Sequence, residues 1–161
     1  MKTIYLAGGC FWGVQKYMDQ FDGITETVVG YANGNTDSPV YEDVKAGKTG
    51  HAETVKVDYD ESRISLEEIL KKYYIVIDPT SLNKQGGDIG ISYRTGIYYT
   101  DPAELEVINQ VTDDIRAKNK KPVVVEIEEL KNFWPAEEYH QNYLDKNPGG
   151  YCHIGACYFG K

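Results

Sequence analysis

A cysteine between glycines and aromatic residues, placed where a strand pattern gives way to a helix pattern, most constrains the fold of this chain. The stretch is Gly8-Gly9-Cys10-Phe11-Trp12-Gly13. Before it, alternating apolar residues predict a strand over residues 2–7. After it, apolar residues recur at helical spacing, at Val14, Tyr17, Met18 and Phe21. Cys10 is therefore expected in a glycine-rich turn that leaves a strand and opens a helix.

The start of a helix favours a negative charge, because free backbone N–H groups and the positive end of the helix dipole point at it. We therefore expect the Cys10 thiol to lose its proton more readily than an ordinary thiol, and the thiolate is the nucleophile. Phe11 and Trp12 suit an apolar pocket beside the sulfur. The pattern also fits an inert buried cysteine with both aromatic residues in the core. The turn alone leaves both interpretations open.

Length and composition indicate one globular domain. The chain has 161 residues, of which 41% are hydrophobic and 12% aromatic. We expect a single domain over 1–161, with a core of about residues 1–130 and a C-terminal segment over 131–161. The net charge of −8 makes nucleic acid and anionic membranes poor partners. Without a long apolar run or a secretion-signal pattern, a cytoplasmic protein is expected. We also expect it to be a monomer.

The chain has three cysteines, Cys10, Cys152 and Cys157. A secreted disulfide scaffold would have more cysteines, in even number. Such cysteines are more often catalytic, metal-bound or buried. Cys152-His153, with Cys157 and His140 nearby, is a weak hint of zinc, but the spacing matches no common zinc module. No metal site is predicted.

The clearest strand pattern covers residues 53–59. Val55, Val57 and Tyr59 share one face. Glu53 has the same parity, which places its carboxyl on the apolar face at the start of the strand. Loss of solvent there would raise the pKa of Glu53 and keep it protonated near neutral pH, as a general acid requires. The alternative is a strand that begins one residue later, with Glu53 in solvent.

The remaining patterns alternate between strands and helices. Strands are predicted over residues 24–31, 93–100 and 123–127. Helices are predicted after a capping box at Ser65 and after Asp101, and a short helix after Phe133-Trp134-Pro135, where His140 is expected at the surface or as a cap. Long loops cover residues 32–50 and 81–92, and the tail from Asn147 is rich in glycine. This order predicts an α+β fold, a two-layer sandwich with a ferredoxin-like βαβ–βαβ core, long active-site loops and a glycine-rich C-terminal tail.

Ordered motifs extend over nearly the whole chain. They are Gly8-Gly9-Cys10-Phe11-Trp12-Gly13, Gly30-Tyr31-Ala32-Asn33-Gly34, Pro39-Val40-Tyr41-Glu42-Asp43-Val44, Thr49-Gly50-His51-Ala52-Glu53, Asp78-Pro79-Thr80, Gln85-Gly86-Gly87-Asp88-Ile89-Gly90-Ile91-Ser92-Tyr93-Arg94, Ala136-Glu137-Glu138-Tyr139-His140-Gln141 and Asn147-Pro148-Gly149-Gly150-Tyr151-Cys152. In this order they resemble the A-type peptide methionine sulfoxide reductases, which act on the S epimer of methionine sulfoxide.

The resemblance implies roles for residues on four segments. Cys10 would attack the sulfoxide sulfur, and Glu53 would protonate the departing oxygen. Tyr41 and Tyr93 would hold that oxygen, and Asp88 would line the same pocket. From the residues alone, Tyr41 is more typical of a loop anchor. A sulfoxide sulfur is a poor electrophile until its oxygen is hydrogen-bonded or protonated, so a neutral carboxylic acid with phenol donors suits the reaction.

The resemblance also implies a methyl pocket and a second thiol. Phe11 and Trp12 would cradle the methyl group on sulfur. Attack would leave methionine and a sulfenic acid on Cys10, which Cys152 would convert to a disulfide. An external dithiol, in this family typically thioredoxin, would reduce it, so no bound cofactor is expected. Cys157 would be a secondary relay or a bystander.

Departures from the usual family pattern leave the proposed catalytic groups in place. Gly87 replaces a usual Asn, residues 91–95 read Ile-Ser-Tyr-Arg-Thr, and Lys45 stands where some members carry a cysteine. Two other functions compete: a module that binds oxidised methionine without turnover, and a general thiol–disulfide oxidoreductase. The second would prefer a Cys-x-x-Cys motif, but position 13 is glycine.

Overall fold

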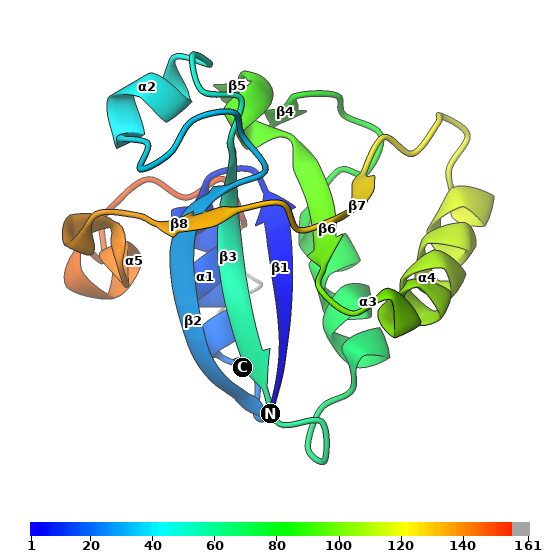
Figure 1. Cartoon of the computed structure of the whole chain (residues 1–161). Coiled ribbons are helices and arrows are strands. Elements are labelled where there is room, and N and C mark those ends of the chain that lie inside the picture. The colour runs from blue at the N-terminus through cyan, green and yellow to red at the C-terminus, as the bar shows by residue number, and fades with distance from the viewer. Residues whose placement is uncertain (156–161) are drawn as a thin grey trace.

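The computed structural model describes residues 1–155, which form a six-stranded sheet with helices packed against it (Figure 1). Along the sheet the order is β7-β6-β1-β3-β2-β8. Its strands are β1 (Lys2–Gly8), β2 (Ile24–Ala32), β3 (Ala52–Tyr59), β6 (Thr95–Tyr99), β7 (Glu126–Glu129) and β8 (Phe133–Pro135). A separate hairpin pairs β4 (Lys84–Gln85) with β5 (Asp88–Ile89). The helices are α1 (Phe11–Asp19), α2 (Tyr41–Lys45), α3 (Leu66–Val76), α4 (Leu105–Lys118) and α5 (Tyr143–Lys146), with 3-10 turns η1 (Ile91–Tyr93), η2 (Pro102–Glu104) and η3 (Glu138–His140).

The four central strands form the ferredoxin-like core. β1 is antiparallel to both β3 and β6, and β2 is antiparallel to β3. The order β6-β1-β3-β2 therefore makes β1 parallel to β2 and β3 parallel to β6. α1 joins the first parallel pair and α3 joins the second, which gives two βαβ units in one sheet. The predicted α+β class is confirmed.

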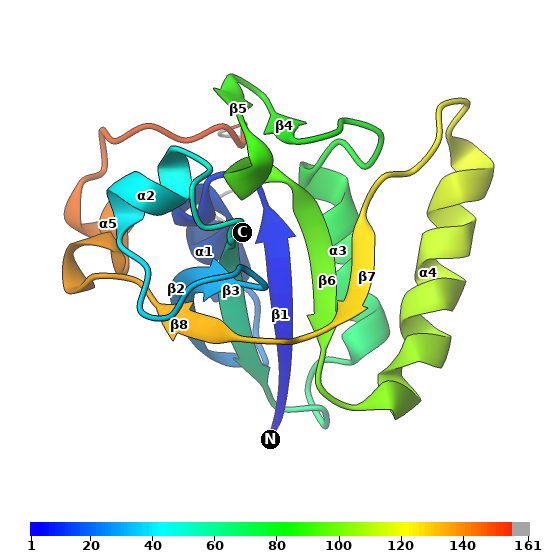
Figure 2. The same ribbon diagram turned by 45° about the horizontal axis from the view of Figure 1, so that its top comes forward.

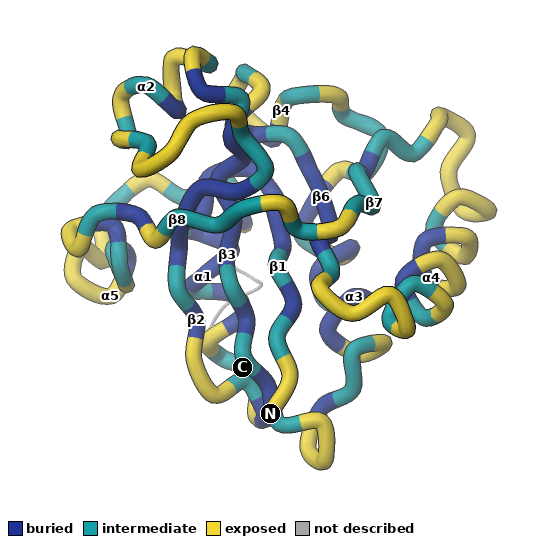
Figure 3. Tube along the Cα trace, in the orientation of Figure 1, coloured by how far each residue is buried: buried dark blue, intermediate teal, exposed yellow. Residues whose placement is uncertain are grey.

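The buried faces follow the periodicities of the sequence. Val55 and Val57 of β3 and Val14 and Met18 of α1 are almost fully buried in one core. Figure 3 shows buried residues concentrated along the central strands. The predicted cap of α3 is present, because the Ser65 hydroxyl accepts a hydrogen bond from the backbone N–H of Glu68. The period-2 and period-3.6 patterns in the sequence thus correctly indicate which face of these strands and helices is buried.

The opposite face of the sheet is covered by the chain between β7 and β8, which crosses in front of β1 in Figure 1. The rings of Tyr5 and Phe133 pack there, with centroids 5.1 Å apart. The close approach is possible because small residues face this segment, namely Ala7, Ala32 and Ala52. β8 then pairs with β2, so the last part of the described chain starts from the edge of the sheet beside α1.

The prediction of a strand over residues 123–127 is wrong in its bounds. β7 begins at Glu126, where it pairs in parallel with Gly96 of β6. Before that, the backbone N–H of Val124 donates to the carbonyl of Pro79, 2.8 Å away, and Val125 packs into the core. The apolar run therefore packs as an irregular segment. The strand itself, β7, lies at the edge of the sheet and pairs with β6 on one side only.

The loops contain short elements that the sequence patterns did not predict. α2 lies in the predicted loop 32–50, and the β4–β5 hairpin and η1 lie in the predicted loop 81–92. β8 was also not predicted, and the short helix expected after it is split into η3 and α5 by Asn142, whose φ is 53°. Among the described helices the longest has 14 residues, and none is long and apolar enough to cross a membrane.

Candidate active site

Cys10 lies at the predicted turn, immediately before the first residue of α1. Gly9 has a φ of 88°, and a Cβ there would come within 2.7 Å of the Cβ of Gln85, so a side chain is excluded twice. The turn brings the β4–β5 hairpin against the start of the helix. Cys10 itself is only 7% exposed.

Glu53 lies beside the start of α1 and is hydrogen-bonded to the first turn of that helix. Its Oε1 accepts a hydrogen bond from the backbone N–H of Phe11, 3.1 Å away. The residue is 1% exposed, and its Oε2 is buried without a hydrogen-bond partner. β3 begins at Ala52, so the parity prediction for Glu53 is confirmed and the solvated alternative is wrong. Burial raises the pKa of Glu53 to about 8, against the opposing effect of the Phe11 N–H. The carboxyl is therefore mostly protonated at neutral pH.

The expectation that Cys10 loses its proton easily is wrong for this state of the protein. Burial raises the pKa of the Cys10 thiol above its usual value, and the nearby Glu53 carboxyl raises it further. The backbone N–H of Trp12 lowers the pKa, as expected at a helix start, but by less than burial raises it. Both Cys10 and Glu53 therefore hold a proton in the absence of a ligand.

Three loop residues named from the resemblance lie close enough to act electrostatically on this pair. Tyr41 begins α2, Tyr93 ends η1 and Asp88 begins β5. Burial raises the pKa of both phenols, and Glu53 and Cys10 raise it further once they have lost their own protons, so each phenol keeps its proton as a donor. Figure 2 shows α2, the β4–β5 hairpin and the chain after α5 gathered at the end of the sheet where β1 leads into α1. The loops thus surround Cys10.

Phe11 and Trp12 occupy different positions beside the cysteine. Phe11 is fully buried, with its ring 5.7 Å from that of Tyr31. Trp12 is partly exposed and stacks on Tyr143, with centroids 3.8 Å apart. Its indole Nε1 donates to Nδ1 of His140, 3.0 Å away. Of the two, Trp12 is the side chain that keeps some exposed surface.

His140 is not at the surface, contrary to the prediction. It is 1% exposed, and its ring packs among those of Phe11, Trp12 and Tyr41. Burial lowers its pKa, so the ring is neutral. His140 holds the indole of Trp12 in place. The sequence around His140 could not reveal this contact, because its partner lies 128 residues away.

Glu137 is a second residue that the sequence patterns missed. Its carboxylate accepts from the phenol of Tyr31 at 2.7 Å and from the backbone N–H of Tyr41 at 3.1 Å. Burial acts to raise its pKa, but the backbone N–H of Glu137 itself, together with the Tyr31 and Tyr41 hydrogen bonds, outweighs it and holds the pKa of Glu137 below its usual value. The charged carboxylate therefore ties the start of α2 to β2.

Cys152 approaches α1 from the segment after α5. A Cβ at Gly13 would lie 2.9 Å from the Cys152 Sγ, so the sulfur rests on the first turn of α1. Neither Cys10 nor Cys152 is in a disulfide, and Cys152 is close enough to raise the pKa of Cys10 slightly. A cavity of about 440 Å³ opens beside Cys152, lined by Lys16, Leu144, Pro148, Gly150, Cys152, Ile154 and Gly155. Cys157 lies outside the described residues.

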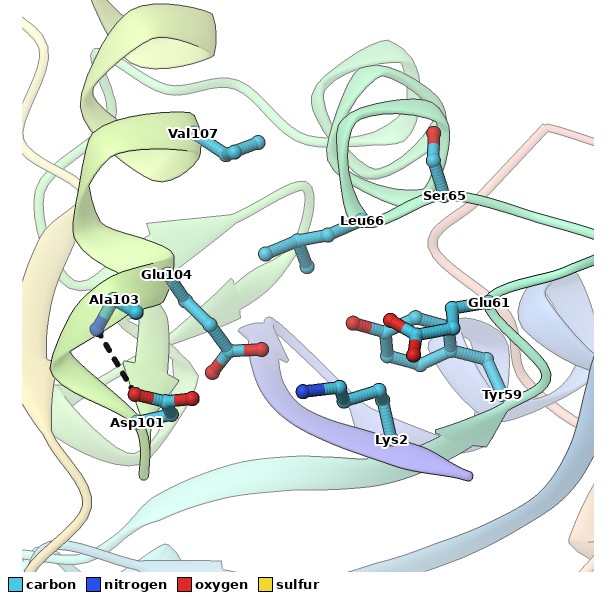
Figure 4. A pocket seen from close by; sticks show the side chains of 9 residues that line it. All are labelled: Lys2, Tyr59, Glu61, Ser65, Leu66, Asp101, Ala103, Glu104 and Val107. Atoms are coloured by element: carbon cyan, nitrogen blue, oxygen red, sulfur yellow. Dashed lines mark hydrogen bonds between the residues drawn. The ribbon is translucent and has the colours of Figure 1, made fainter.

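Two further features lie apart from this cluster. In residues 1–155 no group of three or more His, Cys, Asp or Glu side chains is placed to hold a metal ion. A cavity of about 310 Å³ lies near the N-terminus, where Figure 4 shows Lys2 among the side chains of Tyr59, Glu61 and Glu104. None of the predicted site residues lines it.

Comparison with known proteins decides the family. Residues 2–158 match the family model described as peptide methionine sulfoxide reductase. The chain belongs to this family. It is 58% identical over 158 residues to the peptide methionine sulfoxide reductase MsrA of Lachnoclostridium phytofermentans, which covers 98% of this chain and 95% of that protein. It is 59% identical over 154 residues to an MsrA of Clostridium botulinum, which covers 96% of this chain and 98% of that protein.

Solved structures of the family agree in fold. Reduced Mxr1 of Saccharomyces cerevisiae matches with a TM-score of 0.89 at 40% identity, over 94% of this chain and 88% of that one. Methionine sulfoxide reductase A of Corynebacterium diphtheriae matches with a TM-score of 0.83 at 34% identity, over 94% and 77%. Mxr1 in complex with Trx2 matches with a TM-score of 0.63 at 30% identity, over 88% and 84%. Family membership makes the chain a peptide methionine sulfoxide reductase of the A type, an oxidoreductase, and favours this function over the two competing ones.

Proposed function

We propose that this protein reduces methionine S-sulfoxide, free or within proteins, to methionine and thereby repairs oxidised proteins. The observation that carries the proposal is the pair formed by Cys10 and Glu53. A buried cysteine precedes the first turn of α1, and a buried carboxyl with a pKa of about 8 is held to that turn by the Phe11 N–H. The nucleophile Cys10 and the acid Glu53 are thus both held at the first turn of α1.

The proton positions suit a substrate oxygen that must accept hydrogen bonds and a proton, as the sulfoxide oxygen does. The protonated Glu53 carboxyl can donate to the sulfoxide oxygen, since its Oε2 has no other partner. The phenols of Tyr41 and Tyr93, which keep their protons, supply two further donors to that oxygen. Once Glu53 has given up its proton, its carboxylate can take the proton of Cys10. The raised pKa of Cys10 therefore delays thiolate formation until a substrate is bound.

The balance of the first step is simple. Cys10 attacks the sulfoxide sulfur and an S–S bond forms, while the S–O bond breaks and the oxygen leaves as water with the protons of Cys10 and Glu53. A water molecule then adds its oxygen to the Cys10 sulfur and returns a proton to Glu53, the S–S bond breaks, and methionine is released from a Cys10 sulfenic acid. The methionine sulfur gains two electrons and the Cys10 sulfur loses two. The methyl group would lie against Trp12, whose indole is fixed by His140, with Phe11 behind it. Asp88, which accepts a hydrogen bond from the Tyr151 phenol at 3.1 Å, would close the polar side of the pocket.

The second step uses Cys152. Its thiol displaces the hydroxyl of the Cys10 sulfenic acid to give a disulfide and water, and thioredoxin or a similar dithiol then reduces the disulfide. A complex of the yeast relative Mxr1 with Trx2 supports this partner. Cys157 would act as a secondary relay or as a bystander. We further propose that the chain works as one catalytic domain, a cytoplasmic monomer without bound cofactor, metal, nucleic acid or membrane. The net charge of −8 supports the last two points.

An assay with the separate S and R sulfoxide epimers tests the proposal. With dithiothreitol as reductant, the S epimer should be consumed and the R epimer should remain. Cys10→Ser is the control, and it should lose all turnover because a hydroxyl at this position cannot form the sulfenic acid. Consumption of the R epimer, or turnover by Cys10→Ser, would contradict the assignment.

A further inference from the structure

His153, the residue after Cys152, is docked on the turn that carries Cys10. Its Nε2 lies 2.9 Å from the carbonyl oxygen of Gly8. A carbonyl only accepts hydrogen bonds, so Nε2 carries the proton and donates. Burial lowers the pKa of His153, against the opposing effects of the Gly8 contact and of Asp88, and the ring is neutral. The last residue of β1 thus binds the neighbour of the second thiol.

The seat for this segment is made by glycines from three different elements. A Cβ at Gly9 would lie 3.0 Å from His153 Nε2, and one at Gly86 would lie 3.3 Å from the His153 Cβ. At Gly13, a Cβ would lie 2.9 Å from the Cys152 Sγ and 3.3 Å from the Ile154 side chain. Side chains at these positions would push the segment away. Gly9 on the turn, Gly13 on the helix and Gly86 on the hairpin therefore leave room for residues 152–154, and we call these three residues the glycine track.

The contact with these glycines fixes the position of Cys152. Gly13 follows Cys10 by three residues, so the two lie on the same side of the helix start, about one turn or ~5 Å apart along the axis. Cys152, resting on Gly13, needs only a short movement to reach the sulfur of Cys10. The loss of freedom that disulfide formation requires is then largely incurred before the sulfenic acid appears.

We propose that His153 is a positioning residue for the second step, which through its bond to Gly8 holds Cys152 in register with Cys10. The inference rests on the proposed function of both cysteines. In the step itself the S–H bond of Cys152 and the S–O bond of the Cys10 sulfenic acid break, and the S–S bond forms. The hydroxyl leaves with the thiol proton as water. His153 touches neither sulfur in this scheme and acts only through the placement of its neighbour.

The test separates the two steps in a single turnover. Reduced full-length protein with Cys157→Ser, so that only one partner thiol is present, is mixed with one equivalent of methionine S-sulfoxide and no reductant. Methionine formed reports the first step. Loss of one titratable thiol accompanies the sulfenic acid, which dimedone traps, and loss of a second thiol reports the disulfide. In this background His153→Ala should slow disulfide formation roughly fivefold to tenfold, the effect of losing one hydrogen bond.

The first step should change much less in His153→Ala, and more sulfenic acid should be trapped. His153→Gln, whose amide N–H can still donate to the Gly8 carbonyl, should recover most of the rate. An unchanged disulfide rate in His153→Ala, an equal slowing of both steps, or no recovery in His153→Gln would each overturn the inference. Cys152→Ser is run in parallel in the chain that keeps Cys157. If it still formed the disulfide at the normal rate, the proposed role of Cys152 would fail instead.

Discussion

The two thiols of the described chain lie close together but in very different settings. Cys10 is almost completely buried, in a turn that the core strand β1 and the helix α1 hold from both sides. Cys152 is partly exposed, on a segment without regular structure, and faces a cavity of about 440 Å³. One sulfur is therefore sheltered beside the acid Glu53, while the other can be reached from outside.

This difference separates two chemical tasks. The sulfur that attacks a sulfoxide benefits from a dry site, because hydrogen bonds to the developing oxygen charge are stronger there. The sulfur that exchanges with a protein dithiol must be accessible, since attack on a disulfide requires close approach along the S–S axis. Cys10 and Cys152 divide these requirements between them, and the glycine track keeps them within reach of each other.

The largest loss of activity is expected for Cys152→Ser, which tests whether only Cys152 can be reached by a protein dithiol. With thioredoxin as reductant the variant should stop after about one turnover, because a protein dithiol cannot reach a sulfur that is only 7% exposed. With dithiothreitol, a small reductant, it should continue at a reduced rate. Methionine released per enzyme, measured with each reductant in turn, gives both numbers. Continued turnover with thioredoxin would show that Cys10 is accessible or that Cys157 replaces Cys152.

A smaller loss is expected for Glu53→Gln, which keeps the acceptor for the Phe11 N–H but removes the acid. The chemical step should slow by about a hundredfold to a thousandfold, with substrate binding largely retained. Because the acid must be protonated and its pKa is about 8, wild-type activity should fall as the pH rises above 8. That limb of the pH–rate profile should be absent from Glu53→Gln. An unchanged rate at pH 7 would refute the role of Glu53.

The same variant should be more stable at alkaline pH, which serves as its control for folding. The pKa of Glu53 rises from a usual 4.5 to about 8 on folding, so the folded state binds the proton more tightly. Stability therefore falls as the pH rises between these values, and it stays low above 8. Glu53→Gln lacks this loss. Its melting temperature should exceed that of the wild type at pH 8, and the difference should vanish near pH 4.

The contrast between the two thiols also marks what the sequence could predict. The turn at Cys10 and the buried parity of Glu53 followed from local periodicity, because strand and helix repeats are set by near neighbours. The raised pKa of Cys10 did not follow, since burial depends on the whole fold and outweighs the local effect of the helix start. Tyr41 and Asp88 lie in loops without a periodic pattern, and only the family resemblance pointed to them.

Residues that act through distant partners were missed altogether. His140 bonds to Trp12 across 128 positions, and His153 bonds to Gly8 across 145 positions. No pattern within a window of the sequence can reveal such a pair. The short elements α2 and β8 were missed for a related reason, because tertiary contacts rather than propensity stabilise elements of three to five residues.

The smallest expected effect concerns Glu137, which links the rigid side of the site to the loops. Its carboxylate accepts from both the Tyr31 phenol and the Tyr41 N–H, so it fixes the start of α2 relative to β2. In Glu137→Gln the amide oxygen can accept from the Tyr41 N–H, but without the negative charge that strengthens this hydrogen bond, so Tyr41 should be held less firmly. We expect kcat to fall roughly fivefold, with little change in KM, because Tyr41 is needed most when the oxygen gains charge.

A double-mutant cycle with Tyr41→Phe distinguishes positioning from a general loss of structure. If Glu137 acts through the Tyr41 hydroxyl, Glu137→Gln should have almost no further effect on kcat in the Tyr41→Phe background. Glu138→Gln is the matched control, since Glu138 is the exposed neighbouring carboxylate and its Oε1 lies 3.7 Å from Lys146 Nζ, away from Tyr31 and Tyr41. A fivefold loss in both backgrounds would mean that Glu137 merely stabilises the fold. Non-additivity would instead place α2 with Cys152 among the parts of the site that distant contacts, rather than the core, hold in place.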